Sequence, residues 1–566
     1  MKFSEMQYVH LDIAEVNSQI EEIVKKFKDA KTFSEADCVF EEYNKLSDMV
    51  ETQMALAYIR HTVNTLDEYY NKEQEFMDEN LPVLMEYMQM MTQALLASPF
   101  RAEFTEKYGD LIFTNAEMEL KTFSPEIVAD LQEENKLATE YEKLLASAQI
   151  PFRGEICTVP QLLPYKQDID DATRLEAWTA EGNFYKENKA ELDRLYDELV
   201  RVRDKIGKKL GFEGYTTLGY YRMTRNSYTK EDVAKFRLSV QKYLVPLADK
   251  LYRDQAERIG KSYPLNYADA ALMFRSGNPK PVGTADDILA TAKKFYHELS
   301  PETAEFIDFM MDNDLLDVLS KKGKAQGGYC IEIPDYKAEF IFANFNGTSD
   351  DVETVTHEAG HAFAGYTARN VYPGVLRSPT MESCEIHSMS MEFFAWKAAK
   401  DFYGEQDEKF KYSHLAGAIK FIPYGTMVDH FQHIVYEHPE YTPAQRDDAW
   451  RELTGIYMPW IKLGEIPFYG DGCAWQRQHH IYSRPFYYID YCFAQTVALE
   501  FWALMQKDEK KAWESYKKLV SLAGTKRFTE LVESAELDNP FCETALETVC
   551  KTAAKWLEDF DKSKLV

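Results

Sequence analysis

Residues 327–363 read GGYCIEIPDYKAEFIFANFNGTSDDVETVTHEAGHAF, and this stretch changes character once along its length. Its first part, Gly327–Thr348, is rich in Tyr, Ile and Phe and poor in helix formers, which predicts β-structure. Thr348 and the acidic residues after it supply helix-start signals, so we expect a helix over about Asp350–Ala368. The stretch therefore predicts a β-element that leads directly into a helix.

His357 and His361 frame a His-Glu-x-x-His sequence within the predicted helix. A spacing of four places both imidazoles on one helix face, where they can bind one metal ion, and zinc is the metal typical of this pattern. Glu358 follows the first histidine, where a base could take a proton from a metal-bound water. The alternative is a helix with two partly buried histidines and a surface glutamate, but the β-element and the strong helix start argue against it.

A catalytic zinc site usually has three protein ligands, so a third donor must lie elsewhere in the chain. Glu385 is the best candidate, because it lies in Met381–Glu392, a segment with helical spacing that follows turn residues as a returning second helix would. Glu382 lies one turn earlier and could either accept the second ring N–H of a ligand histidine or be a solvated surface charge. His387 is a rival donor, although a structural role suits it better.

A second segment, Trp475–Tyr491, is rich in His and Tyr and reads WQRQHHIYSRPFYYIDY. The adjacent His479 and His480, together with Tyr488 and Tyr491 at a spacing of three, offer imidazole and phenol donors that could converge on one site. Filling of an aromatic core explains the same composition equally well, so both interpretations stay open at this stage.

The composition is that of a folded chain without nucleic-acid or membrane partners. The 566 residues carry 65 Lys+Arg against 94 Asp+Glu, a net charge of −29, which disfavours binding to phosphate backbones and to anionic lipid surfaces. No apolar run is long enough for a membrane span, and the N-terminus lacks the basic and apolar regions of a signal peptide. We therefore expect a cytoplasmic protein whose eight scattered cysteines are reduced, mostly buried thiols.

Apolar residues recur at spacings of three and four over most of the chain up to about residue 320, which predicts a mainly α-helical architecture. Turn signals separate these helices, but none forms a long flexible linker, and no internal repeat is present. We place an approximate boundary between an N-terminal helical region, 1–180, and a closely packed catalytic region, 181–566.

Taken together, these motifs resemble those of the zinc oligopeptidase family that includes thimet oligopeptidase and oligoendopeptidase F. The segment 327–363, the Glu385 segment and the His-Tyr segment occur in the order and with the spacing of that family. The resemblance covers about residues 180–560 well and the N-terminal part more loosely. It implies a mainly α, bilobed zinc-peptidase fold with a small β-sheet beside the active-site helix and a deep substrate channel. It also implies a single zinc ion per chain and hydrolysis of internal peptide bonds in short unstructured oligopeptides.

The resemblance assigns roles residue by residue. His357, His361 and Glu385 would bind zinc, and Glu358 would act as general base. The strand Ala338–Phe345 would lie beside the bound peptide, where an edge strand can pair with substrate backbone. The residues expected to bind and stabilise the tetrahedral intermediate are His479 or His480, Tyr488 and Tyr491, with Tyr482 a weaker candidate.

Two other functions stay open from the sequence. A zinc carboxypeptidase or dipeptidyl carboxypeptidase can share this fold and these ligands, and Arg477 or Arg484 could hold the C-terminal carboxylate of its substrate. A non-catalytic helical peptide-binding scaffold is the other alternative, although a binding protein has no need of Glu358. The acidic surface gives a mild expectation of neutral or cationic peptides as substrates.

Overall fold

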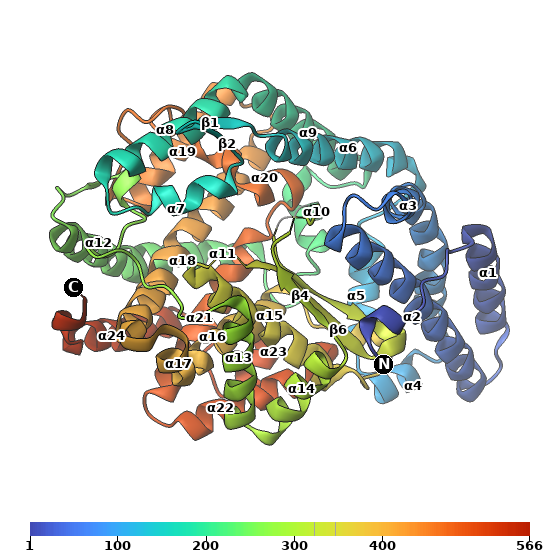
Figure 1. Cartoon of the computed structure of the whole chain (residues 1–566). Coiled ribbons are helices and arrows are strands. Elements are labelled where there is room, and N and C mark those ends of the chain that lie inside the picture. Colours follow the sequence, from blue (N-terminus) through green and yellow to red (C-terminus); the bar gives the residue numbers. More distant parts are fainter. Residues whose placement is uncertain (322, 326, 346, 566) are drawn as a thin grey trace. The chain divides into compact units, whose positions relative to one another are not determined.

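The computed structural model describes residues 1–321, 323–325, 327–345 and 347–565. It divides into two compact units, each assembled from separate stretches of chain: unit 1 is 1–121, 280–407 and 504–537, and unit 2 is 122–279, 408–503 and 538–566. Both units are predominantly helical, which confirms the predicted mainly α fold (Figure 1). The boundary near residue 180 stays a prediction.

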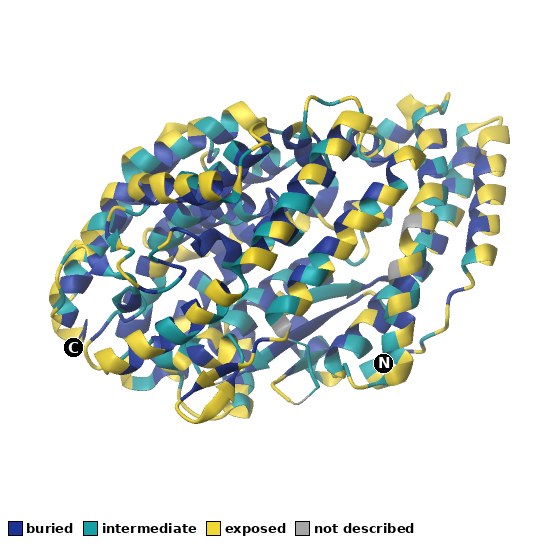
Figure 2. Ribbon diagram, turned by 90° about the horizontal axis from the view of Figure 1, so that it is seen from above, coloured by how far each residue is buried: buried dark blue, intermediate teal, exposed yellow. Residues whose placement is uncertain are grey.

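The helices of unit 1 come from all three of its segments. They are α1 (Ile13–Asp29), α2 (Phe33–Val63), α3 (Glu68–Leu96), α4 (Arg101–Tyr108), α5 (Leu111–Glu119), α13 (Ala285–Leu299), α14 (Pro301–Asp312), α15 (Ser349–Ala368), α16 (Met381–Phe394), α17 (Ala399–Tyr403), α22 (Glu509–Ser521) and α23 (Phe528–Ser534). In α1, Ile20, Val24 and Phe27 are buried on one face, while the charged residues between them are exposed. Figure 2 shows the same alternation of buried and exposed positions along other helices.

A three-stranded sheet in unit 1 contains the predicted β-element. The element forms two antiparallel strands, β5 (Tyr329–Ile333) and β6 (Ala338–Phe345), joined by a tight turn in which Lys337 has a left-handed φ of 49°. The third strand, β4 (Leu316–Leu319), pairs in parallel with the other side of β6 (Figure 1). Asn346, inside the predicted β-element, lies outside the described residues.

The expectation that the strand 338–345 is an edge strand is wrong. The strand order is β4-β6-β5, so β6 is central and its backbone pairs with a neighbour on each side. Seven of its eight residues are buried. The near-continuous apolar sequence AEFIFANF is typical of a strand covered on both faces, which explains the central position.

The two predicted helices beside this sheet are confirmed as α15 and α16. At the start of α15 the backbone N–H of Gly347 donates to Asp351 Oδ2 at 2.7 Å, and acidic residues occupy the first turn. α15 packs against both β6 and α16. Gly360 allows a close approach of the two helices, because a Cβ atom there would lie only 2.6 Å from the backbone oxygen of His387 in α16.

Unit 2 is also built mainly from helices. They are α6 (Val128–Ala146), α7 (Leu163–Lys166), α8 (Asp171–Glu187), α9 (Lys189–Lys209), α10 (Tyr215–Arg222), α11 (Lys230–Ser239), α12 (Val245–Ile259), α18 (Asp407–Glu437), α19 (Pro443–Tyr457), α20 (His479–Ser483), α21 (Tyr488–Met505) and α24 (Glu543–Asp559). Two short strand pairs accompany them, β1 (Ile150–Phe152) with β2 (Glu155–Cys157), and β3 (Leu265–Asn266) with β7 (Ile461–Lys462).

A buried ion pair fixes the start of α21 in unit 2. Arg225 Nη2 lies 3.0 Å from Asp490 Oδ1, and both side chains are fully buried. The same Nη2 donates to the backbone oxygen of Phe486. These contacts anchor the turn that precedes α21 and so position the residues of its first turn.

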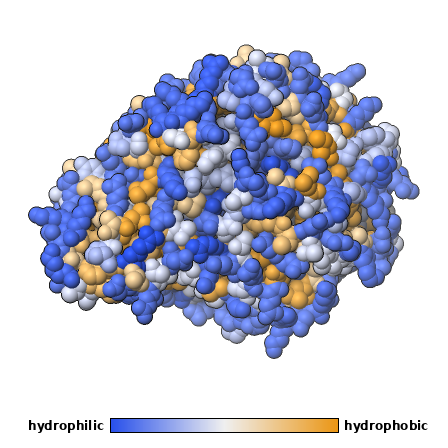
Figure 3. All heavy atoms as spheres, turned by 180° about the vertical axis from the view of Figure 1, so that it is seen from behind, coloured by the Kyte–Doolittle hydropathy of each residue, from blue (hydrophilic) through white to orange (hydrophobic). Residues whose placement is uncertain are grey.

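The surface and the thiols add two observations. Hydrophilic residues predominate on the face drawn in Figure 3, with smaller apolar areas between them. Within the described ranges, no helix has both the length and the apolar content that crossing a bilayer requires. All eight cysteines are free, four of them buried and two exposed, so fewer are buried than the sequence led us to expect.

Candidate metal centre and active site

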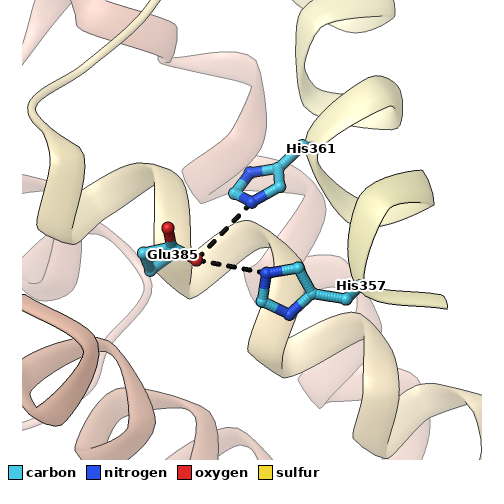
Figure 4. Close-up of side chains that lie close together, drawn as sticks. All are labelled: His357, His361 and Glu385. Carbon is cyan, nitrogen blue, oxygen red and sulfur yellow. Dashed lines mark ion pairs between the residues drawn. The ribbon is translucent and has the colours of Figure 1, made fainter. Parts of the chain in front are cut away.

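Three side chains of unit 1 converge where the sequence predicts a metal site. His357 and His361 project from one face of α15 toward Glu385 on α16 (Figure 4). Glu385 Oε2 lies 3.3 Å from His357 Nε2 and 3.5 Å from His361 Nε2. The carboxylate is almost completely buried at 5% exposure, whereas the imidazoles keep 23% and 20%. The three donors therefore face a common point that solvent can reach on the imidazole side.

This donor set fits a zinc ion. Ligand atoms about 2.0–2.1 Å from a tetrahedral zinc are separated from one another by about 3.3 Å, close to the distances between Glu385 and the two imidazoles. One ligand atom from each residue lies within 4.8 Å of the others. Burial opposes ionisation of Glu385, but His361 and His357 outweigh it and lower the pKa of the carboxyl well below its usual range. The carboxylate form of Glu385 is thus favoured, whereas Glu385 and Glu392 outweigh burial and raise the pKa of His357, so protons compete with a metal ion for this site.

A second carboxylate orients His357 from behind. The Nδ1 atom of His357 lies 2.7 Å from Oε1 of Glu392. Glu392 lies two helical turns after Glu385 on α16. A carboxylate in this position fixes the orientation of the ring and keeps Nε2 directed at the point that the three donor atoms share. Glu382, the residue considered for such a role from the sequence, is fully buried, so it is not a solvated surface charge. The structure thus adds Glu392 to the predicted set.

His387, the rival donor, does not belong to the group of three converging side chains. It is buried, and its backbone oxygen accepts a hydrogen bond from the Tyr516 hydroxyl at 2.9 Å. Burial, with a smaller contribution from His361, lowers the pKa of His387 to about 3, so its imidazole is neutral. These contacts describe a core histidine, in keeping with the structural role preferred from the sequence.

Glu358 follows the ligand candidate His357 directly on α15. It is buried, and its Oε1 lies near Gly328, where a Cβ atom would be 3.5 Å away. Burial raises the pKa of Glu358, partly offset by His357 and His361. A carboxyl with a raised pKa holds a proton more readily than an ordinary glutamate, which suits a group that must both accept and return one.

The tandem histidines of unit 2 have different surroundings. The ring of His480 lies 5.0 Å from that of Tyr488 and 5.9 Å from that of Tyr491, both edge-on. His479 is 47% exposed, with Nε2 3.1 Å from Glu142 Oε1. The structure therefore brings His480, and not His479, together with the two predicted tyrosines.

Gln478 determines which nitrogen of His480 carries the proton. The Tyr424 hydroxyl donates to Gln478 Oε1 at 2.8 Å, so the amide NH₂ group is directed at His480 Nδ1, 3.0 Å away. Because the amide nitrogen can only donate, Nδ1 of a neutral His480 accepts and Nε2 bears the hydrogen. His480 is thereby prepared as a hydrogen-bond donor through Nε2.

The other candidates of the His-Tyr segment lie in different surroundings. Tyr482 is fully buried, stacks on Tyr141 with ring centroids 3.9 Å apart, and donates to the backbone oxygen of Leu192, so it belongs to the core. Arg484 is exposed, whereas Arg477 is only partly accessible.

Tyr424 and Gln478 were not singled out from the sequence, because no local pattern links residues 54 positions apart.

Comparisons with known proteins identify the family of the chain. A family model described as the peptidase M3 N-terminal domain matches residues 3–123, and one described as peptidase family M3 matches residues 296–550. A solved structure of a provisionally assigned oligoendopeptidase F is similar over 100% of both chains, with 46% identity and a TM-score of 0.96. No match was found among curated proteins.

Two further solved structures are comparably similar. PZ peptidase A, solved with an inhibitor, shares 45% identity over 99% of this chain and 100% of its own, with a TM-score of 0.95. A provisionally assigned oligoendopeptidase F from Bacillus anthracis shares 45% identity over 100% of this chain and 99% of its own, with a TM-score of 0.92. The similarity thus extends over the full length of the chain in each case.

Proposed function

The chain belongs to peptidase family M3 and is a metalloendopeptidase, and from this premise we propose that it is a zinc enzyme that hydrolyses internal bonds of short unstructured peptides. The observation that carries the proposal is the convergence of His357, His361 and Glu385, with Glu358 beside them on α15. A ligand set alone would serve a structural metal, whereas an adjacent buried carboxylate that binds no metal serves hydrolysis.

The ligands would hold zinc through the Nε2 atoms of the two histidines and through Glu385 Oε2. When bound, zinc activates water as a nucleophile near neutral pH and polarises the scissile carbonyl. Glu392 keeps the His357 ring in the orientation that this binding needs. Glu358 accepts the proton that the attacking water loses and returns it to the leaving amine, a role that its raised pKa supports.

His480, Tyr488 and Tyr491 are proposed as donors to the tetrahedral oxyanion. The contact with Gln478 turns His480 into an Nε2–H donor, and the phenols of the two tyrosines are donors of the same kind. Each preorganised donor of this type contributes roughly a hundred- to a thousandfold in rate. His479 is left out of this group because it contacts Glu142 and solvent instead.

The test is mass spectrometry of a ladder of unstructured peptides, from a few residues to about thirty, after incubation with zinc-loaded protein. The wild type, Glu358→Gln and the matched control Glu405→Gln, whose side chain is exposed, are compared, and the zinc content of each is measured. We expect internal cuts with the wild type and the control, confined to the shorter peptides. We expect Glu358→Gln to bind zinc fully and to cut at least 100-fold more slowly, the lower limit of the usual effect of a general base.

Three other results would contradict the proposal. Stepwise loss of residues from one end would indicate a carboxypeptidase or dipeptidyl carboxypeptidase. Unchanged cleavage by Glu358→Gln would exclude this residue as the base. Absence of cleavage by the zinc-loaded wild type would indicate a peptide-binding scaffold.

A further inference from the structure

Arg477 of unit 2 presents a guanidinium group that lacks a close counter-ion. Its side chain is 32% exposed, and Nη1 lies 3.5 Å from the Tyr469 hydroxyl and 3.8 Å from Glu181 Oε1, with the Tyr424 hydroxyl as a further hydrogen-bond partner. Within the part of the chain that the structure describes, Glu181 is the one acid within 4.0 Å of this group. Most of the five donors of the guanidinium therefore remain available to a ligand.

The charge of Glu181 is already balanced by another residue. Lys166 Nζ lies 2.5 Å from Glu181 Oε2, with both side chains buried, and the Tyr469 hydroxyl donates to Oε1. Burial lowers the pKa of Lys166, and the nearby Arg477 lowers it further. Two cations thus share a single carboxylate, which leaves an excess positive charge in a protein whose net charge is −29.

Aromatic rings surround this charge. Trp178 lies edge-on to Tyr267 and Tyr469 at 5.0 and 5.2 Å, and the Arg477 guanidinium carbon lies 6.0 Å from the Trp178 ring and 5.9 Å from the Tyr469 ring. These walls limit hydration around the guanidinium and strengthen a hydrogen bond to an anion there. A planar fork of donors between aromatic walls is well suited to a carboxylate.

The group adjoins the proposed catalytic donors of the same unit. Arg477 precedes Gln478, whose side chain connects Tyr424 with His480. The Tyr424 ring in turn lies edge-on to Tyr488 at 5.9 Å. Arg477 is therefore linked to His480 and Tyr488 through Gln478 and Tyr424.

We propose that Arg477 binds a carboxylate of the peptide substrate, either the C-terminal carboxylate or that of an acidic side chain. The proposal rests on the proposed peptidase function. It also implies a local preference for an anionic group, against the general preference for neutral or cationic peptides that the acidic surface would give.

The test is direct binding in the inactive Glu358→Gln background, which separates recognition from turnover. One peptide that the wild type cuts is compared as free acid and as C-terminal amide, and a second pair differs by an internal Glu or Gln. We expect one pair to show about ten- to a hundredfold tighter binding of the carboxylate form, as a charge-assisted hydrogen bond would give. Adding Arg477→Gln should remove that difference, while the matched control Arg201→Gln, at an exposed position on α9, should keep it.

A conservative variant keeps the test valid if Arg477→Gln does not fold. Arg477→Lys retains the charge without the planar fork, so a reduced but measurable preference for the carboxylate form is expected. Equal binding of both members of each pair by a protein that cuts peptides normally would overturn the assignment of Arg477 alone. Absence of peptide cleavage by the zinc-loaded wild type would instead overturn the proposed function, and the assignment with it.

Discussion

The Nδ1 atom of His357 lies 2.7 Å from Oε1 of Glu392, so a residue of α15 is oriented by a residue of α16. The same α16 helix provides Glu385, whose Oε2 lies 3.3 Å from the opposite nitrogen of the His357 ring. The imidazole is therefore held between two carboxylates that lie seven residues apart on one helix. Its orientation depends on the packing of the two helices as much as on its own side-chain rotamer.

Replacing Glu392 with Gln tests this relationship. The amide cannot accept the Nδ1–H with the strength of a carboxylate, so we expect zinc affinity to fall about 10–100-fold. Competition with a chelator of known affinity measures the change, and Glu405→Gln is the exposed control. Unchanged zinc affinity in Glu392→Gln would show that ring orientation does not depend on this carboxylate.

A methyl group at Gly360 is expected to separate α15 from α16. Its Cβ atom would lie 2.6 Å from the backbone oxygen of His387, and backbone cannot move aside as a flexible side chain can. We expect Gly360→Ala to lower the free energy of unfolding by about 1–3 kcal/mol, measured by denaturant unfolding, and to weaken zinc binding. At Gly417, in α18, a Cβ atom meets nothing within 4 Å. Gly417→Ala should therefore stabilise by about 0.5–1 kcal/mol, and a similar gain at Gly360 would contradict the close approach.

The buried pair of Arg225 and Asp490 is expected to be important for stability. Asp490→Asn removes the ion-pair partner of a buried guanidinium, which should cost about 3–5 kcal/mol in the free energy of unfolding. Asp559→Asn, in the exposed pair with Lys555, should change it by less than about 1 kcal/mol. Equal effects of the two substitutions in chemical denaturation would contradict the proposed anchoring of α21.

Glu500 should make stability depend on pH. Burial raises the pKa of its carboxyl to about 8, although the backbone N–H of Asp538 donates to Oε2 at 2.8 Å and acts in the opposite direction. Between the ordinary glutamate pKa of about 4.3 and this value the folded state binds a proton that the unfolded state has lost, so stability falls as pH rises through that range.

Glu500→Gln removes this dependence. Its melting temperature should match that of the wild type below about pH 4, where the carboxyl is protonated in both states, and exceed it increasingly up to about pH 8. With about 1.4 kcal/mol for each pH unit between the two pKa values, the expected gain in the free energy of unfolding at pH 8 is about 4–5 kcal/mol. A difference that is constant over this range would show that Glu500 titrates alike in the folded and unfolded chain.

Local patterns were sufficient to predict the helices that carry the metal ligands. The acidic first turn predicted where α15 begins, and the spacing of His357 and His361 predicted their common face. Glu385 could be singled out because its segment follows turn residues and has helical spacing. The role of Glu392 was missed, although its separation of seven residues from Glu385 places it on the same face of α16.

Contacts between distant segments could not be predicted in this way. The central position of β6 depends on its pairing with β4, which precedes it by about twenty residues. The difference between His479 and His480 arises from Tyr488, Tyr424 and Glu142, and no short pattern reports which ring faces which neighbour. Such pairings follow from tertiary packing, which periodicity does not encode.

The alternation of the chain between the two units has a consequence for biosynthesis. Unit 1 starts with residues 1–121 but is completed only by 504–537, and unit 2 is completed later still, by 538–566. At about 5–20 residues per second, the ribosome reaches residue 504 roughly 20–80 s after residue 121. The core that α1–α5 share can form early, because all but one of its buried members, Leu376, lie within residues 11–113, but neither unit can be completed before nearly the whole chain has been made. We expect ribosome-bound chains to remain protease-sensitive until nearly full length, and to depend on chaperones over that interval.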